Sequence, residues 1–167
     1  MAPVAVFVGA PGAGKTTVGQ AVAQLLGVPF ADSDTIIEER AGKPIPEIFF
    51  DDGEDAFRAL ERSAITTALA GFDGILAVGG GAIMDAGTRE SLGVHTVVFL
   101  SVELSDAVKR VGLGAGRPLL SVNPRATLKY LLDQRKPLYA SVATHTVATD
   151  GREVTEIADE IAALLKA

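Results

Sequence analysis

The stretch GAPGAGKTT at residues 9–17 decides the fold, since it directly follows the apolar run VAVFV at residues 4–8. It matches the pattern Gly, four residues, Gly-Lys-Ser/Thr, a loop whose backbone N–H groups cradle phosphates. The glycines let these N–H groups turn inward on an anion without a Cβ in the way. Lys15 adds a point charge, and the hydroxyl of Thr16 can join the coordination of a magnesium ion. The pattern predicts a nucleotide-binding site here, with an ordinary glycine-rich turn as the alternative.

A helix is predicted directly after this loop. Apolar residues recur there at helical spacing from Val18 to Leu26, and Gly27 is a natural helix stop. The N-terminus of this helix points at the loop, so its dipole favours an anion there. The ATP contacts expected from the loop and the start of the helix are Gly12, Ala13, Gly14, Lys15, Thr16 and Thr17.

Length and charge limit the possible classes of protein. The chain has 167 residues, which fits a single domain over residues 1–167. Its formal net charge of −6 argues against nucleic acid or an anionic membrane as a partner. It has no cysteine, which excludes disulfide and thiolate chemistry. With no basic leader and an apolar N-terminal run too short to span a membrane, we expect a cytoplasmic protein, and a monomer.

Short apolar, β-branched runs alternate with helical patterns along the chain, which is typical of a parallel α/β sheet. Strands are predicted at residues 4–8, 28–31, 75–78, 96–100 and 146–149. Further helices are predicted at about residues 35–41, 54–70, 88–92, 105–111, 124–142 and 155–165. Residues 112–123 hold three glycines, one arginine and little apolar periodicity. This segment indicates a mobile loop, with a plain surface connection as the alternative.

Two carboxylates lie where a nucleotide-binding domain needs an acid near magnesium. The strand at 28–31 is followed by Asp32 and Asp34, which places both at the carboxyl edge of the sheet, where open α/β sheets bind ligands. We expect Asp32 near the magnesium shell, contacting the metal through water, and Asp34 facing the acceptor. Helix capping is the alternative, and one carboxylate can do both.

Regulatory GTPases are excluded by their missing motifs. Readers of guanine of that kind use an Asn-Lys-x-Asp element, and the only asparagine here is Asn123, which a proline follows. No Asp-x-x-Gly element is present either. The chain is also too short for the large cores of motor-type ATPases. Small P-loop kinases remain.

Beyond the P-loop, the chain resembles the shikimate kinase family over almost its whole length. The residues that carry the resemblance are DSD at 32–34, IFFDDGEDAFRALE at 48–61, the glycines at 79–81, RPLL at 117–120 and RKPLY at 135–139. This combination in this order is far more restrictive than the P-loop alone. One departure is Ser33, where the family commonly has Thr, and we expect it to be neutral.

The resemblance implies an α/β fold like that of nucleoside-monophosphate kinases, with a five-stranded parallel sheet in the order 2-3-1-4-5. It implies ATP-dependent phosphorylation of the 3-hydroxyl of shikimate, giving 3-phosphoshikimate and ADP, on the route to aromatic amino acids. It further implies a substrate-binding region at about residues 32–61, a lid at about residues 112–123, and Mg²⁺ with ATP as co-substrate.

Two arginines are suited to a small carboxylated polyol. Arg58 and Arg135 carry guanidinium forks that can hold a carboxylate bidentately. Arg58 could instead form a helix-surface ion pair with Glu54 or Glu61, and Arg135 could lie on a solvated helix face. The resemblance suggests that Glu61 orients Arg58, so this ion pair could belong to the site.

The remaining substrate contacts are expected from Asp34 and from Gly79, Gly80 and Gly81, whose bare N–H groups could approach substrate oxygens. A tight strand-to-helix turn would also use glycine. Asp34 can orient the acceptor hydroxyl or take its proton late in transfer. Because the transition state is loose, positioning and charge neutralisation should matter more than deprotonation.

Several further roles follow from the resemblance. Lys15, magnesium and Arg117 would share the charge on the transferring phosphoryl group. Arg110 resembles the arginine that packs on adenine, with a second contact near Arg152. Phe49 and Phe57 could wall the ring of the substrate or belong to the core, whereas the two histidines match no catalytic role.

Two rival functions stay open. Another small-molecule P-loop kinase, of the gluconate or nucleotide-monophosphate type, would share the phosphate loop. A noncatalytic ATP-binding regulator would also keep the cradle. The presence of Lys15, Asp34 and Arg117 together argues against such a regulator, because loss of phosphoryl transfer commonly removes one of them.

Overall fold

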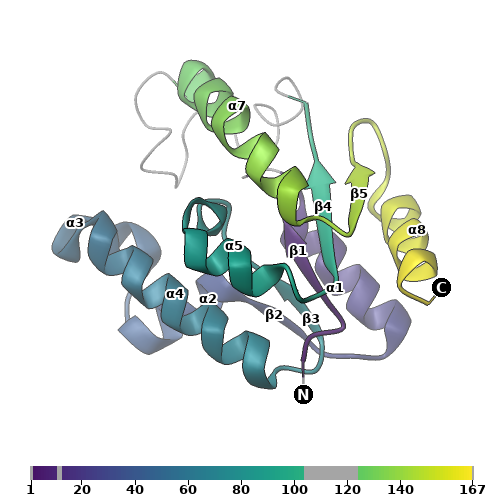
Figure 1. The fold of residues 1–167 in the computed structure, drawn as a ribbon, viewed down its shortest axis with the longest axis horizontal. Coiled ribbons are helices and arrows are strands. Elements are labelled where there is room, and N and C mark those ends of the chain that lie inside the picture. Colours follow the sequence, from purple (N-terminus) through teal and green to yellow (C-terminus); the bar gives the residue numbers. More distant parts are fainter. Residues whose placement is uncertain (1, 11–12, 104–123, 167) are drawn as a thin grey trace.

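The computed structural model describes residues 2–10, 13–103 and 124–166, and at its centre lies a five-stranded parallel sheet (Figure 1). The strands are β1 (Ala5–Val8), β2 (Phe30–Asp32), β3 (Ile75–Ala77), β4 (Val97–Ser101) and β5 (His145–Ala148). Their order is β2-β3-β1-β4-β5, and every neighbouring pair is parallel. The predicted order 2-3-1-4-5 is confirmed.

The burial of the central strand β1 explains why an apolar run in the sequence predicts it. All four of its residues are buried, as expected for a parallel strand covered on both faces. Ala5 and Phe7 face one layer of the core, and Val6 and Val8 face the other. In register, Val6 lies between Leu76 of β3 and a valine of β4.

Helices cover both faces of the sheet. Helices α1 (Lys15–Leu26) and α8 (Val154–Lys166) pack against each other on one face. The other face is covered by α4 (Glu54–Gly71), α5 (Ala86–Leu92) and α7 (Pro124–Val142), with the 3₁₀ turn η1 (Ala82–Met84) between β3 and α5. Figure 1 shows α5 and α7 in front of the sheet and α1 behind it.

A smaller layer lies beyond the sheet and carries much of the predicted substrate region. Helices α2 (Ser33–Ala41) and α3 (Ile45–Asp52) pack on α4 around a separate apolar cluster. Its buried members are Ile37, Ile48, Phe57 and Ala64. In Figure 1 this layer lies to the left of the sheet, past its β2 edge.

The structure corrects the predicted elements at three places. Strand β2 starts at Phe30, because the N–H of Val28 donates to the carbonyl of Ala23 and closes the end of α1. Helix α3 was not among the predicted helices. Pro44 at its N-cap and a proline in its first turn displace no helical hydrogen bond, so a helix can begin there. The turn η1 was also not predicted.

The predicted helix at 105–111 and the segment 112–123 lie outside the described residues. In the parts of the chain that the structure describes, no helix has both the length and the apolar character needed to cross a membrane.

Candidate active site

The phosphate loop closes around the side chain of Lys15, the first residue of α1. Gly14 precedes it with φ of 88°, a conformation that favours glycine. The Lys15 Nζ donates to the carbonyls of Gly9 at 2.7 Å and Ala10 at 3.1 Å. A Cβ on Gly9 would lie 2.6 Å from the carbonyl oxygen of Leu100 in β4, so only glycine fits there. The ammonium group and the N-terminus of α1 therefore face the same space.

Asp32 links this loop to the neighbouring strand. It ends β2 and is the N-cap of α2, where its Oδ1 accepts from the N–H of Asp34 at 2.8 Å. Its Oδ2 accepts from the Thr16 Oγ1 at 2.8 Å. Capping and a place beside the phosphate loop therefore coexist in one carboxylate, because each of its two oxygens serves one contact.

The pair formed by Thr16 and Asp32 suits a magnesium ion. A hydroxyl and a carboxylate are hard oxygen donors, and Mg²⁺ in phosphate sites takes one or two protein ligands and keeps several waters. Within residues 2–10, 13–103 and 124–166, no group of three or more His, Cys, Asp or Glu side chains could hold a metal ion by itself. A metal ion held by Thr16 and Asp32 would need further ligands, such as water or phosphate oxygens.

One cavity of about 450 Å³ joins the phosphate loop to both predicted ends of the site. It is lined by Ala13, Gly14, Lys15, Thr16, Thr17, Val18, Asp32, Asp34, Val78, Gly79, Gly80, Thr149, Arg152, Val154 and Ile157. The structure therefore brings Arg152 and the described loop residues into one space with Asp34 and two of the glycines. Gly12, Arg110 and Arg117 lie outside the described residues.

Arg152 is fixed at one end of this cavity by contacts within the chain. Its Nε lies 3.0 Å from Glu156 and its Nη2 lies 2.6 Å from Glu160. Its Nη1 donates to the carbonyl of Ala148 at 2.8 Å. Hydrogen bonds to Glu160 and Glu156 raise the pKa of Arg152. Each of its three nitrogens thus has a partner, which leaves the flat face of the guanidinium for stacking on an aromatic ring such as a nucleobase.

At the other end of the cavity, two carboxylates converge on Gly79. A Cβ on Gly79 would lie 2.8 Å from Oδ1 of Asp34 and 2.9 Å from Oε2 of Glu61. The glycine is needed because both acids approach the backbone this closely. Its N–H is not bare as predicted, however, since it donates to the Oγ of the buried Ser33 at 3.0 Å. Gly79 therefore contributes space rather than a donor.

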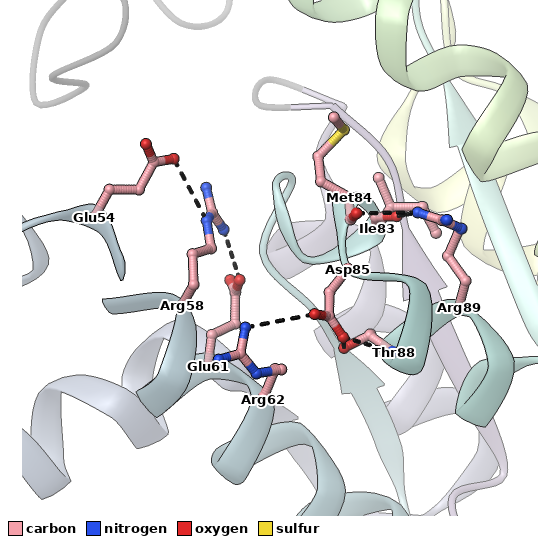
Figure 2. Close-up of polar contacts among 9 residues, drawn as sticks. All are labelled: Glu54, Arg58, Glu61, Arg62, Ile83, Met84, Asp85, Thr88 and Arg89. Carbon is pink, nitrogen blue, oxygen red and sulfur yellow. Dashed lines mark hydrogen bonds and ion pairs between the residues drawn. The ribbon is translucent and has the colours of Figure 1, made fainter. Parts of the chain in front are cut away.

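Arg58 lies beside the last of the three glycines and is held by acids of its own helix (Figure 2). Its Nη1 donates to Glu61 at 2.6 Å, and its Nε lies 3.7 Å from Glu54. A Cβ on Gly81 would lie 2.3 Å from its Nη2. The helix ion pair and a place at the glycine turn are thus both real features of Arg58.

Glu61 is a buried carboxylate whose charge depends on its neighbours. Burial raises the pKa of Glu61, and the charge of Asp34 raises it further. The positive charges of Arg58 and Arg135 act in the opposite direction. All four groups therefore lie close enough to influence one another, although they come from α2, α4 and α7.

Arg135 is not on a solvated helix face, which was the alternative prediction. It is only 6% exposed, and its Nε is buried without a hydrogen-bond partner among the described residues. Leaving a buried donor unsatisfied costs about 1–3 kcal/mol or more for a charged group. A carboxylate of a bound ligand would provide the missing acceptor.

The two phenylalanines that could wall the substrate or belong to the core differ in burial. Phe57 is buried in the cluster of α2, α3 and α4, so it belongs to the core. Phe49 packs on it with ring centroids 4.8 Å apart, and is itself partly exposed.

Sequence reasoning missed the contacts that brace η1 behind the glycine turn (Figure 2). Arg89 donates to the carbonyls of Ile83 at 2.8 Å and Met84 at 3.0 Å. Asp85 caps α5 by accepting from the N–H of Thr88 at 2.8 Å, a hydrogen bond that lowers the pKa of Asp85. Only the cap has a sequence signal, an Asp directly before a helix. The arginine contacts depend on the fold.

Comparison with known proteins gives a consistent result. The family model described as shikimate kinase matches residues 11–166. A shikimate kinase from Salinispora arenicola is 66% identical over 167 residues, covering 100% of both chains. One from Salinispora tropica is 67% identical over 165 residues, covering 99% of each. Among solved structures, a shikimate kinase from Acinetobacter baumannii in complex with shikimate has a TM-score of 0.94 at 39% identity, covering 99% of this chain and 93% of that one.

Proposed function

The chain belongs to the shikimate kinase family, and we propose that it transfers the γ-phosphoryl group of ATP to the 3-hydroxyl of shikimate. The products are ADP and 3-phosphoshikimate, an intermediate on the route to aromatic amino acids. The family match covers residues 11–166, and the relatives from Salinispora span the same length as this chain.

The observation that best supports an acidic acceptor is the buried Nε of Arg135, which has no hydrogen-bond partner in the part of the chain that the structure describes. Arg58 and Arg135 both act on the charge of Glu61, so two guanidinium groups gather at the glycine end of the site. A small carboxylated substrate placed there would accept from both. We propose Arg58, Arg135, Asp34 and the glycine turn as the shikimate-binding set, with Gly80 and Gly81 approaching the substrate closely.

The roles at the phosphate end follow from its geometry. We propose that Lys15, the loop residues Gly12 to Thr17 and Arg152 bind ATP, with Arg110 and Arg117 as further contacts predicted from the sequence. Asp34 faces the cavity from the first turn of α2, between the phosphate loop and the glycines. From there it can orient the acceptor hydroxyl toward the phosphate and accept its proton as transfer completes.

We further propose that Thr16 and Asp32 hold Mg²⁺, Asp32 through water. Mg²⁺ neutralises charge that builds on the phosphate oxygens during transfer. A cytoplasmic location and a monomeric state complete the proposal, both resting on composition alone.

The test is a panel of acceptors. ADP release is measured with purified protein, MgATP and either shikimate, gluconate, AMP or no acceptor. Release with shikimate alone is expected, and 3-phosphoshikimate should appear in equal amount. Release with gluconate or AMP instead would assign the chain to another kinase class. No release with any acceptor, together with tight ATP binding, would favour a noncatalytic regulator.

A further inference from the structure

The carbonyl of Gly80 is held by the last residue of the RKPLY stretch, Tyr139, to which no role in the site has yet been assigned. The hydroxyl of Tyr139 donates to the Gly80 oxygen at 2.5 Å. Tyr139 belongs to α7 and is 1% exposed, and its ring packs against Phe99 with centroids 5.1 Å apart. It thus connects the glycine turn to a helix 59 residues away in the sequence.

A second hydroxyl holds the same turn from α2. The Oγ of Ser33 accepts from the N–H of Gly79 at 3.0 Å, and Ser33 is fully buried. The turn is therefore fixed through an N–H at one glycine and through a carbonyl at the next. Both hydroxyl groups come from helices that also carry a residue of the substrate set.

Each of these two hydroxyls lies close in the sequence to a proposed substrate-binding residue of the same helix. Ser33 directly precedes Asp34, whose carboxylate approaches Gly79. Tyr139 lies four residues after Arg135, and residues at this spacing share one face of a helix. Any shift of the turn relative to α2 or α7 would therefore change the distances from its glycines to Asp34 and Arg135, which lie on these two helices.

Tyr139 is well suited to act as a permanent donor. Burial raises the pKa of Tyr139 to about 12, against the opposing positive charge of Arg135. The hydroxyl therefore keeps its proton throughout the physiological range. Packing alone would be served by phenylalanine, since the contact with Phe99 is one between two tilted rings.

We propose that Tyr139 and Ser33 are positioning residues for the acceptor: their hydroxyls fix the glycine turn, and with it the place of the turn relative to Asp34, Arg58 and Arg135. This inference rests on the proposed function for the identity of the acceptor. Its structural part, that two hydroxyls immobilise the turn, does not.

The experiment compares Tyr139→Phe, Ser33→Ala and the double variant. Tyr139→Phe keeps the ring and removes only the hydroxyl, which also interacts with Arg135. Each single change should raise the KM for shikimate about 3- to 10-fold, the range for losing one neutral hydrogen bond. The KM for ATP should stay within about twofold, because sites without shared partners respond independently. The double variant should raise the shikimate KM by less than the product of the two single effects, since both loosen one turn.

Two control variants match the chemistry elsewhere. Tyr130→Phe removes an exposed hydroxyl from the same helix, where the residue is 63% exposed. Thr144→Val removes a hydroxyl that accepts from the N–H of Val97 at 3.0 Å, near the opposite end of β4. Thr144→Val should lower the thermal stability as the loss of one partly buried hydrogen bond does, without separating the two KM values.

Hydrogen exchange of residues 79–85 supplies a readout that needs no substrate. It should be faster in Tyr139→Phe and Ser33→Ala than in wild type, and unchanged in Thr144→Val. Unchanged exchange in the first two variants would overturn the proposal, as would a common rise of both KM values or no rise at all. If the wild type fails to phosphorylate shikimate, the proposed function fails by itself, and the exchange result alone decides whether the hydroxyls hold the turn.

Discussion

The two ends of the cavity are built in different ways. At the phosphate end, the decisive contacts are local: Lys15 reaches carbonyls five and six residues earlier, and the loop runs directly into its helix. At the acceptor end, the contacts join distant segments, since Gly79 meets α2 and α4, and Gly80 meets α7. The phosphate end is therefore built from one contiguous sequence motif. The acceptor end forms only where the fold brings distant segments together.

The ends also differ in how they handle charge. The ammonium of Lys15 is partly buried and lies on backbone carbonyls, where the helix dipole favours anions. The acceptor end buries formal charges of both signs, with Glu61 3% and Arg135 6% exposed. Buried charges need close partners, and the Nε of Arg135 has none within residues 2–10, 13–103 and 124–166. Substitutions at the acceptor end should therefore change mainly the binding and use of the acceptor. Substitutions at the phosphate end should affect the reaction with any acceptor.

Asp34→Asn should separate the two ends most strongly. The amide keeps the shape of the side chain but loses the charge that orients the acceptor hydroxyl, so kcat should fall about 10²- to 10⁴-fold. ATP binding should change by less than about twofold, because Asp34 lies toward the glycines. Steady-state kinetics and calorimetry with ATP would measure both, with the exposed Asp55→Asn as control. A loss of ATP affinity as large as the loss of turnover would place Asp34 at the phosphate end instead.

Arg58→Lys tests whether the acceptor end reads a carboxylate. Lysine keeps the charge but not the fork, so shikimate affinity should fall by about 1–3 kcal/mol, or roughly 5- to 150-fold. Calorimetry with shikimate measures this, and ATP affinity should barely move. The matched control is Arg40→Lys, at an exposed position of α2. Unchanged shikimate affinity in folded Arg58→Lys would reduce Arg58 to a helix ion pair with Glu61.

Asp32→Asn tests the phosphate end. Asparagine is an equally good N-cap, so α2 should persist. The lost charge should raise the Mg²⁺ concentration for half-maximal activity about 10- to 100-fold, as for other residues that act on a metal through a second contact. Asp85→Asn is the matched control, because Asp85 caps α5 in the same way without lining the cavity. If both variants keep the wild-type magnesium requirement, Asp32 is a cap alone.

The same contrast explains what the sequence could predict. The sheet order, which the family resemblance implied, is confirmed. The phosphate loop was predicted from one contiguous motif. The hydroxyl of Ser33 on Gly79 and the hydroxyl of Tyr139 on Gly80 were not predicted. They join residues 46 and 59 positions apart, and hydroxyls carry no pattern that announces a distant backbone partner.

The burial of Arg135 was also not predicted from the sequence. Arg135 could be placed on a helix from the sequence, but not inside the protein, because charged residues on helices are mostly exposed. Helix α3 was also not predicted, and its packing on α4 is a tertiary contact that the sequence alone does not show.

Glu61→Gln gives the smallest effect and tests the buried charge of the acceptor end directly. Burial raises the pKa of Glu61 above its ordinary value of 4.5. Between that value and the raised one, the folded state holds more protons than the unfolded state, so the wild type loses stability as the pH rises through this window. Glutamine does not titrate, and the variant lacks this loss. The unfolding free energy of Glu61→Gln relative to wild type should therefore increase with pH.

The effect is bounded, because one carboxyl changes the free energy of unfolding by at most about 1.4 kcal/mol per pH unit. Thermal or urea unfolding from pH 4.5 upward would measure it. Glu54→Gln is the matched control, since Glu54 also pairs with Arg58 but its side chain is 55% exposed. Its stability relative to wild type should show no such rise. If Glu61→Gln instead loses stability relative to wild type as the pH rises, Arg58 outweighs burial, and the acceptor end is held together by an ion pair rather than constrained by a buried acid.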